Sequence, residues 1–134
     1  MAGKDRIQVA VFYAGLKDKQ DSLQLQTIDN RYEGYIRAIH CRMINFLCLK
    51  IGQKKYAAII DNDGLRRKSM PPSSIDYEGG TIADIATVGN LIICKDGRNR
   101  FDGITKADYR NIKECIHLYE KNGKKYQVLV SEVA

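Results

Sequence analysis

The chain has 134 residues, the size of one ordinary domain, with 44% hydrophobic and 28% charged residues. This composition excludes a disordered chain, and no stretch approaches the roughly 18 apolar residues of a membrane span. The net charge of +6 favours acidic partners such as nucleic acid, a nucleotide or an acidic protein surface, although a basic surface without any ligand explains it equally well.

Two hairpins are predicted in the first half of the chain. Residues 6–13 and 22–28 both alternate between apolar and polar side chains, which predicts two paired strands joined by a turn. The apolar runs 46–51 and 55–60 predict two more strands, because Gly52-Gln53-Lys54 between them suits a tight hairpin connection.

The segments that flank the second hairpin contain weaker signals. Asp29 or Asn30 can cap one short helical turn, which Gly34 would end. Alternation in YIRAIHC, residues 35–41, then predicts a strand. A further strand, centred on 91–94, is expected after a long loop that follows the second hairpin.

The clearest helix is predicted to begin after Thr105. This residue can cap the first turn, and Asp108, three residues later, supplies the reciprocal acid of a capping box. Apolar side chains recur at helical spacing over 109–119, and Asn122-Gly123 would stop the helix. The final stretch 124–130 is predicted to be a strand that can add to a neighbour's sheet and form a homodimer.

Together these elements predict a single globular domain over residues 1–134. Its class is α+β, with a mostly antiparallel sheet and one main C-terminal helix packed on it. The start of the chain lacks the apolar run of a secretory signal, which favours a cytoplasmic protein. The four cysteines are accordingly interpreted as reduced residues of the core.

The stretch AAIIDNDGL, residues 57–65, begins like a calcium-binding loop but does not continue as one. With Gly64 at the sixth position of such a loop, Ile59 would occupy the first position and Met70 the twelfth. Neither side chain can bind calcium, whereas Asp61 to Gly64 suit a turn after a strand. We therefore predict a turn here and no metal site.

Two basic clusters provide the candidate contact surface. The first lies in a connection of unusual length after the turn, and the second follows the strand centred on 91–94. The residues concerned are Arg66, Arg67, Lys68, Lys95, Arg98 and Arg100. If both loops leave the sheet at the same end, they form one patch for an anionic partner; otherwise each is a solvated surface loop.

Motifs of enzyme chemistry are absent from the sequence. No phosphate-binding loop, dinucleotide fingerprint, zinc-protease or serine-hydrolase motif occurs. His40 and His117 have no acid or nucleophile spaced to pair with them, which favours structural roles. A zinc site from Cys41, Cys48, Cys115 and His117 would match no known ligand spacing. The sequence thus predicts no cofactor and no metal, and it disfavours an enzyme.

Five segments in a fixed order resemble one protein family. They are GYIRAI at 34–39, IDNDGL at 60–65, MPPSS at 70–74, VGNLIICKDG at 88–97 and FDGITKADYRNIKE at 101–114. In this order the chain resembles domain of unknown function family 3846, short proteins carried by phages, plasmids and integrative elements. The resemblance spans about residues 22 to 116 and carries over no catalytic residue, because the family has none assigned.

The resemblance implies an accessory factor of a mobile element. We expect a non-catalytic, counter-defence interaction protein that binds a host protein or an anionic nucleotide signal through the basic loops. The alternative is a nucleic-acid-binding accessory domain, and an enzyme acting on a nucleotide-like substrate ranks below both. Salt separates the first two, because phosphate-backbone binding weakens steeply as salt rises and an apolar protein interface does not.

Overall fold

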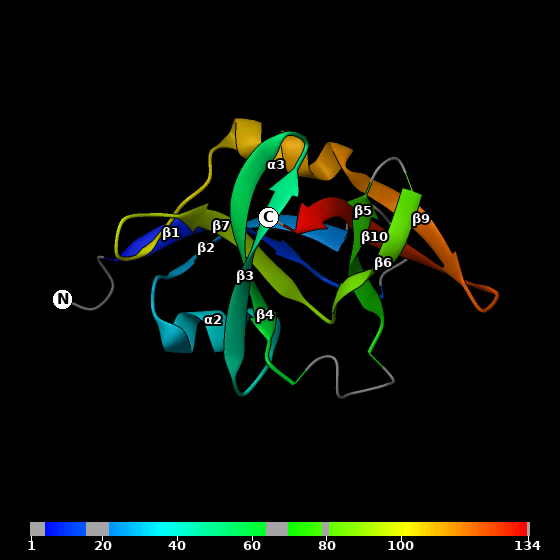
Figure 1. The fold of residues 1–134 in the computed structure, drawn as a ribbon. Coiled ribbons are helices and arrows are strands. Elements are labelled where there is room, and N and C mark those ends of the chain that lie inside the picture. Colours follow the sequence, from blue (N-terminus) through cyan, green and yellow to red (C-terminus); the bar gives the residue numbers. More distant parts are fainter. Residues whose placement is uncertain (1–4, 16–21, 64–69, 79–80, 134) are drawn as a thin grey trace.

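The computed structural model describes residues 5–15, 22–63, 70–78 and 81–133, and Figure 1 shows their arrangement. The described residues form ten strands and two short helices. The helices are α2 (Tyr32–Ile39) and α3 (Lys106–Glu114). The strands are β1 (Arg6–Phe12), β2 (Leu23–Asp29), β3 (Ile44–Ile51), β4 (Lys54–Asp61), β5 (Pro72–Glu78), β6 (Thr81–Val88), β7 (Leu91–Asp96), β8 (Phe101–Asp102), β9 (Ile116–Lys121) and β10 (Lys124–Val133).

The strands join into one mixed sheet in the order β2-β1-β7-β4-β3-β10-β5-β6. β8 pairs with β7, and β9 pairs with β10. All pairs are antiparallel except β10 with β5, which is parallel. The two predicted hairpins, β1–β2 and β3–β4, are confirmed, and Gly52 and Gln53 both have the positive φ of a two-residue hairpin turn.

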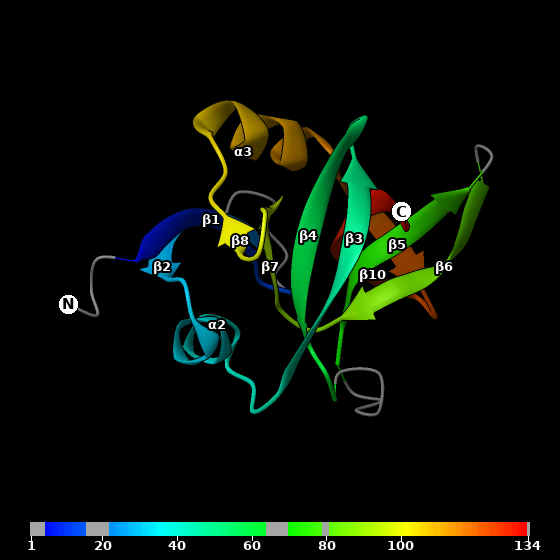
Figure 2. The same ribbon diagram turned by 60° about the vertical axis from the view of Figure 1, so that its left-hand side comes forward.

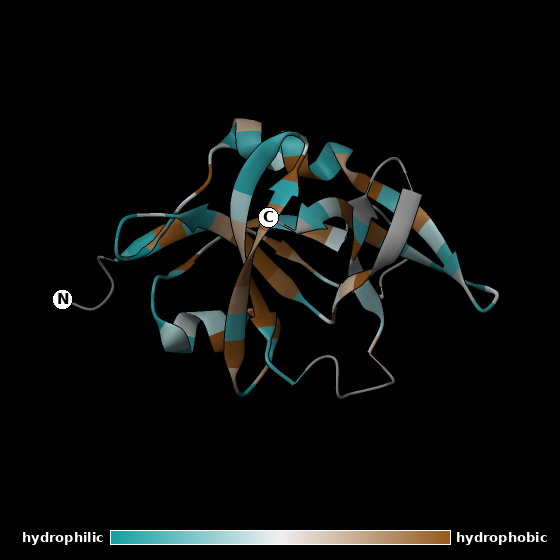
Figure 3. Cartoon of the chain, in the orientation of Figure 1, coloured by the Kyte–Doolittle hydropathy of each residue, from teal (hydrophilic) through white to brown (hydrophobic). Residues whose placement is uncertain are grey.

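The sheet over β2, β1, β7, β4 and β3 has helices on opposite sides, α2 on one face and α3 on the other (Figure 2). Alternate residues of each strand therefore enter two different cores. In β1, Val9 and Val11 face the α2 core, whereas Ala10 and Phe12 face the α3 core. Burial on both faces explains why hydrophobic residues concentrate in these central strands (Figure 3).

The prediction of an α+β fold with one main C-terminal helix was wrong. Helix α3 has nine residues and ends at Glu114, and the residues expected in its second half form strand β9. Asn122 and Gly123 make a two-residue turn from β9 into β10, with φ of 54° and 79°. The signal misled because Ile112 and Ile116 are four residues apart, a spacing that suits one face of a helix and one face of a strand alike.

The prediction of a strand over 35–41 was also wrong, because these residues belong mostly to helix α2. Tyr35 and Ile39 are again four residues apart, and both are buried on the α2 side of the sheet. Gly34 does not end this helix but lies inside it, where an added Cβ would lie 2.1 Å from the Asp29 carbonyl oxygen. Glycine is therefore required for the close approach of α2 to the end of β2.

The long loop predicted after the second hairpin is largely replaced by strands β5 and β6, which pair with irregular register. Ser73, Ser74 and Thr87 are buried in this pair. The Thr87 hydroxyl shares hydrogen bonds with the hydroxyls of Ser73, at 2.7 Å, and Ser74, at 2.6 Å. Small polar residues and prolines usually indicate a loop in sequence. Here the hydroxyls satisfy one another, and the segment can enter the sheet.

Strand β10 is confirmed but is not a free edge strand. Lys124–Leu129 pair with β9, Leu129–Ser131 pair with β5, and Glu132 and Val133 pair with β3. Strand addition to a neighbouring molecule needs unpaired backbone groups along an edge. Residues 124–128 pair with β9 alone among the described strands, so the homodimer expected through this strand stays a prediction.

Candidate functional site

The two strands that precede the predicted basic loops, β4 and β7, end at opposite ends of the sheet. β4 and β7 are antiparallel, with Ile60 opposite Leu91 and Ala57 opposite Cys94. The C-terminal end of β4 therefore lies beside the start of β7, and the C-terminal end of β7 lies at the opposite end of this pair. The condition for one shared patch is not met. Arg66, Arg67 and Lys68 themselves lie outside the described residues.

Two of the three cations in the second cluster are neutralised by carboxylates. Lys95 Nζ lies 3.0 Å from Asp108 Oδ2. Arg100 lies 2.8 Å from Asp5 Oδ1 and 3.8 Å from Asp102 Oδ1. Arg98 is exposed and has no ion pair within the described part of the chain. Lys95 and Arg100 are therefore already ion-paired, and Arg98 is the cation of this cluster without a pair among the described residues.

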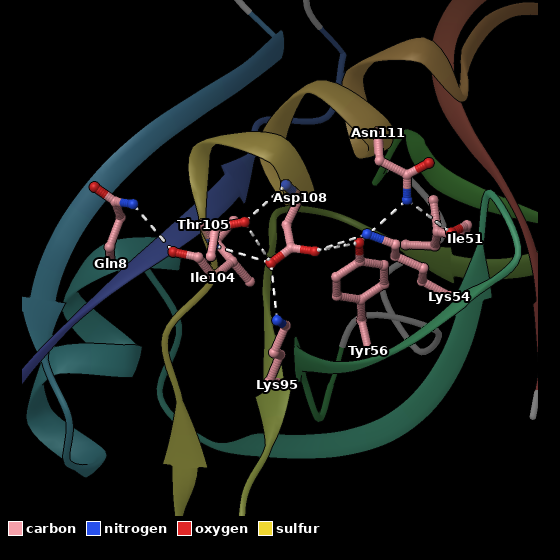
Figure 4. A network of polar contacts seen from close by, with 9 residues as sticks. All are labelled: Gln8, Ile51, Lys54, Tyr56, Lys95, Ile104, Thr105, Asp108 and Asn111. Carbon is pink, nitrogen blue, oxygen red and sulfur yellow. Dashed lines mark hydrogen bonds and ion pairs between the residues drawn. The ribbon is translucent and has the colours of Figure 1, made fainter.

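Asp108 is the centre of the most extensive polar network (Figure 4). It is buried at the start of α3, where it closes the predicted capping box with Thr105. It also accepts a hydrogen bond of 3.0 Å from the Tyr56 hydroxyl. Burial alone raises the pKa of Asp108, but hydrogen bonds from Thr105, Lys95 and Tyr56 outweigh it and hold the pKa well below its usual range.

The partners of Asp108 are satisfied as well. Burial and the neighbouring carboxylate raise the pKa of Tyr56 to about 12, so its hydroxyl stays a donor. Asn111 Nδ2 donates to the Tyr56 hydroxyl at 3.1 Å and to the Ile51 carbonyl at 3.0 Å. A carboxylate that stays ionised and a phenol that stays neutral do not exchange protons near neutral pH. We therefore interpret the network as the anchor of α3 on β4 and β7.

Exposed apolar side chains occur in α2, in the connection that follows it and in β3. Of the described residues, the large hydrophobic side chains that stay exposed are Tyr32 (46%), Met43 (54%), Phe46 (56%) and Leu118 (58%). Tyr32 is in α2, Met43 lies in the connection between α2 and β3, and Phe46 is in β3. Phe101, on β8, packs edge to face against Phe46 with ring centroids 5.4 Å apart. We call Tyr32, Met43, Phe46 and Phe101 the aromatic patch.

Tyr32 and Phe101 each make a contact that holds part of this region in place. The Tyr32 hydroxyl donates to the carbonyl of Arg42, which precedes Met43. Phe101 also packs edge to face against Tyr35 of α2, at 5.8 Å between centroids. The ring of Phe101 thus lies between the buried side of α2 and the exposed ring of Phe46, and the patch extends from the α2 core.

Strand register explains why Phe46 is exposed. Phe46 pairs with Ile59, which faces the α2 core, whereas the next residue, Leu47, packs against the α3 core. Helix α2 packs on β2, β7 and β4. Phe46 on the adjoining strand β3 therefore faces the same side as α2 and remains uncovered. The sequence did not reveal this, because Phe46 stands in an apolar run that indicates a buried strand.

Neither histidine lies in the element predicted for it, which was a strand over 35–41 for His40 and a helix over 109–119 for His117. His40 is the left-handed residue that ends α2, with φ of 58°, and His117 is in β9; both are exposed. Within the described residues, no group of three or more His, Cys, Asp or Glu side chains is arranged to hold a metal ion. No helix in the described ranges is long and apolar enough to cross a membrane.

Comparison with models of known protein families, with curated proteins and with solved structures found no match to this chain. The resemblance to domain of unknown function family 3846 therefore stays a prediction.

Proposed function

We propose that this protein is a non-catalytic interaction protein that binds a partner protein through the aromatic patch. The observation that carries the proposal is the exposed ring of Phe46, held edge to face by Phe101, together with the exposed side chains of Tyr32 in α2 and Met43 in the connection that follows it. Single exposed hydrophobic residues are common, but a group of aromatic residues and methionine is characteristic of the buried centre of protein interfaces.

Phe46 has the features of an interface anchor. Its ring is already oriented by Phe101 on one side, and 56% of its surface is exposed to solvent. An anchor of this kind loses little side-chain freedom when a partner covers it, and the apolar area removed from water stabilises the complex. Arg42 next to Met43 is exposed and makes no ion pair among the described residues, so it can serve the polar rim.

The wider context that we propose is the one that the resemblance implies. The protein would be an accessory factor of a phage or mobile element that acts in the cytoplasm on a component of host defence. This rests on the five similar segments and on the positive net charge of the chain. The basic loops would contribute to the rate of association rather than to the centre of the interface, since most of their described cations are already paired.

A nucleic-acid-binding accessory domain remains the second candidate. The net charge of +6 supports it. The pairing of Lys95 with Asp108 and of Arg100 with Asp5 argues against it, because phosphate contacts need free cations. Binding that falls steeply between low and physiological salt would favour this candidate over an apolar protein interface.

The test uses two equally exposed hydrophobic residues on different surfaces. The protein, Phe46→Ala and the control Leu118→Ala are used to capture partners from nuclease-treated cytosol, and the captured protein is then purified and its affinity measured. We expect Phe46→Ala to weaken binding by about 30-fold or more, as an interface hot spot does. Leu118→Ala, on β9, should bind like the unchanged protein. Equal affinity of all three proteins would contradict the proposed function.

A further inference from the structure

A groove of about 290 Å³ lies between strand β2 and helix α2, apart from the aromatic patch. Its polar lining consists of Arg6, Tyr13, Gln26, Thr27, Asp29, Arg37 and His40. Small-molecule sites have volumes of roughly 300–1,000 Å³, so the groove is at the lower limit of this range and suits only a small ligand.

One face of α2 and the strand β2 form the two walls. Gly34, Arg37 and Ala38 line the groove and follow one another at the i, i+3 and i+4 positions of one helix face. The missing side chain of Gly34 lets the helix approach Asp29 closely. The buried residues Tyr35 and Ile39 hold the helix to the core, so Arg37 is presented on a fixed support.

The charge of the groove is positive. Arg6 Nε lies 3.4 Å from Asp29 Oδ1, and the same carboxylate is shared with Arg31 at 3.9 Å. Arg37 is exposed and makes no ion pair with any described residue. A cation in the last turn of a helix offsets its negative end, which accounts for Arg37 as a charge. The second arginine of the lining, Arg6, is paired with Asp29, which lines the groove as well.

The strand side of the groove supplies a neutral donor. Gln26 Nε2 donates to the Tyr13 hydroxyl at 2.6 Å, so the Tyr13 oxygen accepts from inside the protein. The structure shows no acceptor for the Tyr13 hydroxyl proton among the described residues. That proton is therefore free to be donated to a ligand in the groove.

From this arrangement we propose that the groove binds a small phosphate monoester. The guanidinium of Arg37 presents a planar fork of donors that matches phosphate oxygens, and the guanidinium of Arg6, paired with Asp29, supplies further N–H donors. The Tyr13 hydroxyl and the Gln26 amide bind the polar body of the ester. This site goes beyond the proposed partner surface, because none of its lining residues belongs to the aromatic patch.

The test follows backbone amide shifts by NMR while inorganic phosphate, adenosine 5′-monophosphate or adenosine is added at millimolar concentration. The nucleotide should shift the amides of residues 37, 38 and 40. It should also bind more tightly than inorganic phosphate, and adenosine should leave these amides in place. Arg37→Ala should weaken binding of the nucleotide by about 10-fold or more, as the loss of a charge-assisted hydrogen bond does.

Matched variants distinguish specific binding in the groove from non-specific attraction of the ligand to surface charge. Arg37→Lys keeps the charge but not the planar fork, so it should restore binding only in part. Arg110→Ala removes an exposed arginine from α3, across the sheet, and should bind like the unchanged protein. Three results would overturn the proposal: no amide shifts, equal shifts with adenosine, or equal weakening by Arg110→Ala. Inorganic phosphate binding as tightly as the nucleotide would overturn the assignment to an ester.

Discussion

The ring of Phe46 packs edge to face against the ring of Phe101 at 5.4 Å between centroids, and yet 56% of Phe46 remains exposed. The ring of Phe46 is thus held in a fixed orientation while much of its apolar surface stays exposed. Phe101 in turn contacts Tyr35, a buried residue of α2, so the exposed ring is supported from the core. This relationship is the basis of the proposed partner surface.

Replacing Phe46 should affect binding far more than folding. The Phe46→Ala variant loses one aromatic contact and little burial, so its free energy of unfolding should fall by no more than about 1.5 kcal/mol. Urea denaturation measures this directly. A loss several times larger would mean that Phe46 is a core residue in solution, and the partner surface would then lose its anchor.

Asp108→Asn should destabilise the protein strongly. The amide can neither accept all the hydrogen bonds that the carboxylate accepts nor pair with Lys95. We expect the free energy of unfolding at neutral pH to fall by about 2–4 kcal/mol, as for a buried charge-assisted network that is left partly unsatisfied. Thr105→Ala, which removes only the cap hydroxyl, should cost about 1 kcal/mol. Equal stability of Asp108→Asn and the unchanged protein would refute the anchoring role of Asp108.

The same carboxylate should make stability depend on acid pH. The folded pKa of Asp108 is lowered, so its contribution is fully present above the unfolded value of about 3.9 and is lost as pH falls toward the folded pKa. The difference in stability between the unchanged protein and Asp108→Asn should therefore be largest at neutral pH and shrink below about pH 4. A difference that stays constant from pH 7 to pH 3 would contradict this assignment.

Gly34→Ala should destabilise the protein, although alanine has a higher helix propensity than glycine. On an exposed helix the change would add about 1 kcal/mol of stability. In α2 the new Cβ would lie 2.1 Å from the Asp29 carbonyl oxygen, which is backbone and cannot move aside alone. We expect a loss of about 1–3 kcal/mol by thermal or urea unfolding, as for an overpacked site. Any gain in stability would show that α2 does not approach β2 this closely.

Thr87→Val should weaken the pairing of β5 with β6. The hydroxyl of Thr87 is the common partner of the Ser73 and Ser74 hydroxyls, and all three side chains are buried. Valine keeps the shape but leaves the two serines without this partner, so we expect a loss of about 1–3 kcal/mol in unfolding free energy. Ser73→Ala combined with Thr87→Val should recover part of the loss, because fewer polar groups then remain unsatisfied.

Features of this fold that depend on neighbouring residues could be predicted from the sequence, whereas features that depend on long-range contacts could not. The capping box of Thr105 and Asp108 is confirmed, because both partners are three residues apart and need no tertiary context. The identities of α2 and β9 were missed, because pairs such as Tyr35 and Ile39 suit a helix and a strand equally. Only their tertiary partners, the sheet face for α2 and β10 for β9, decide between the two.

The candidate surfaces could not be predicted for the same reason, because they depend on contacts between residues far apart in the chain. Lys95 and Arg100 are basic in sequence, but their carboxylate partners Asp108 and Asp5 are distant along the chain, so neutralisation was not visible. Phe46 looked like a core residue because its exposure depends on which strands α2 covers. The antiparallel pairing of β4 with β7, which separates the ends of these two strands, is likewise a property of topology alone.

The central claim is that a partner protein covers Phe46, and site-specific crosslinking tests it most directly. A photoreactive phenylalanine analogue is placed at position 46, or at the equally exposed position 118, and each protein is irradiated in nuclease-treated cytosol. We predict one defined protein adduct from position 46 that excess unchanged protein suppresses, while excess Met43→Ala suppresses it less. No adduct from position 46, or the same adducts from positions 46 and 118, would contradict the account.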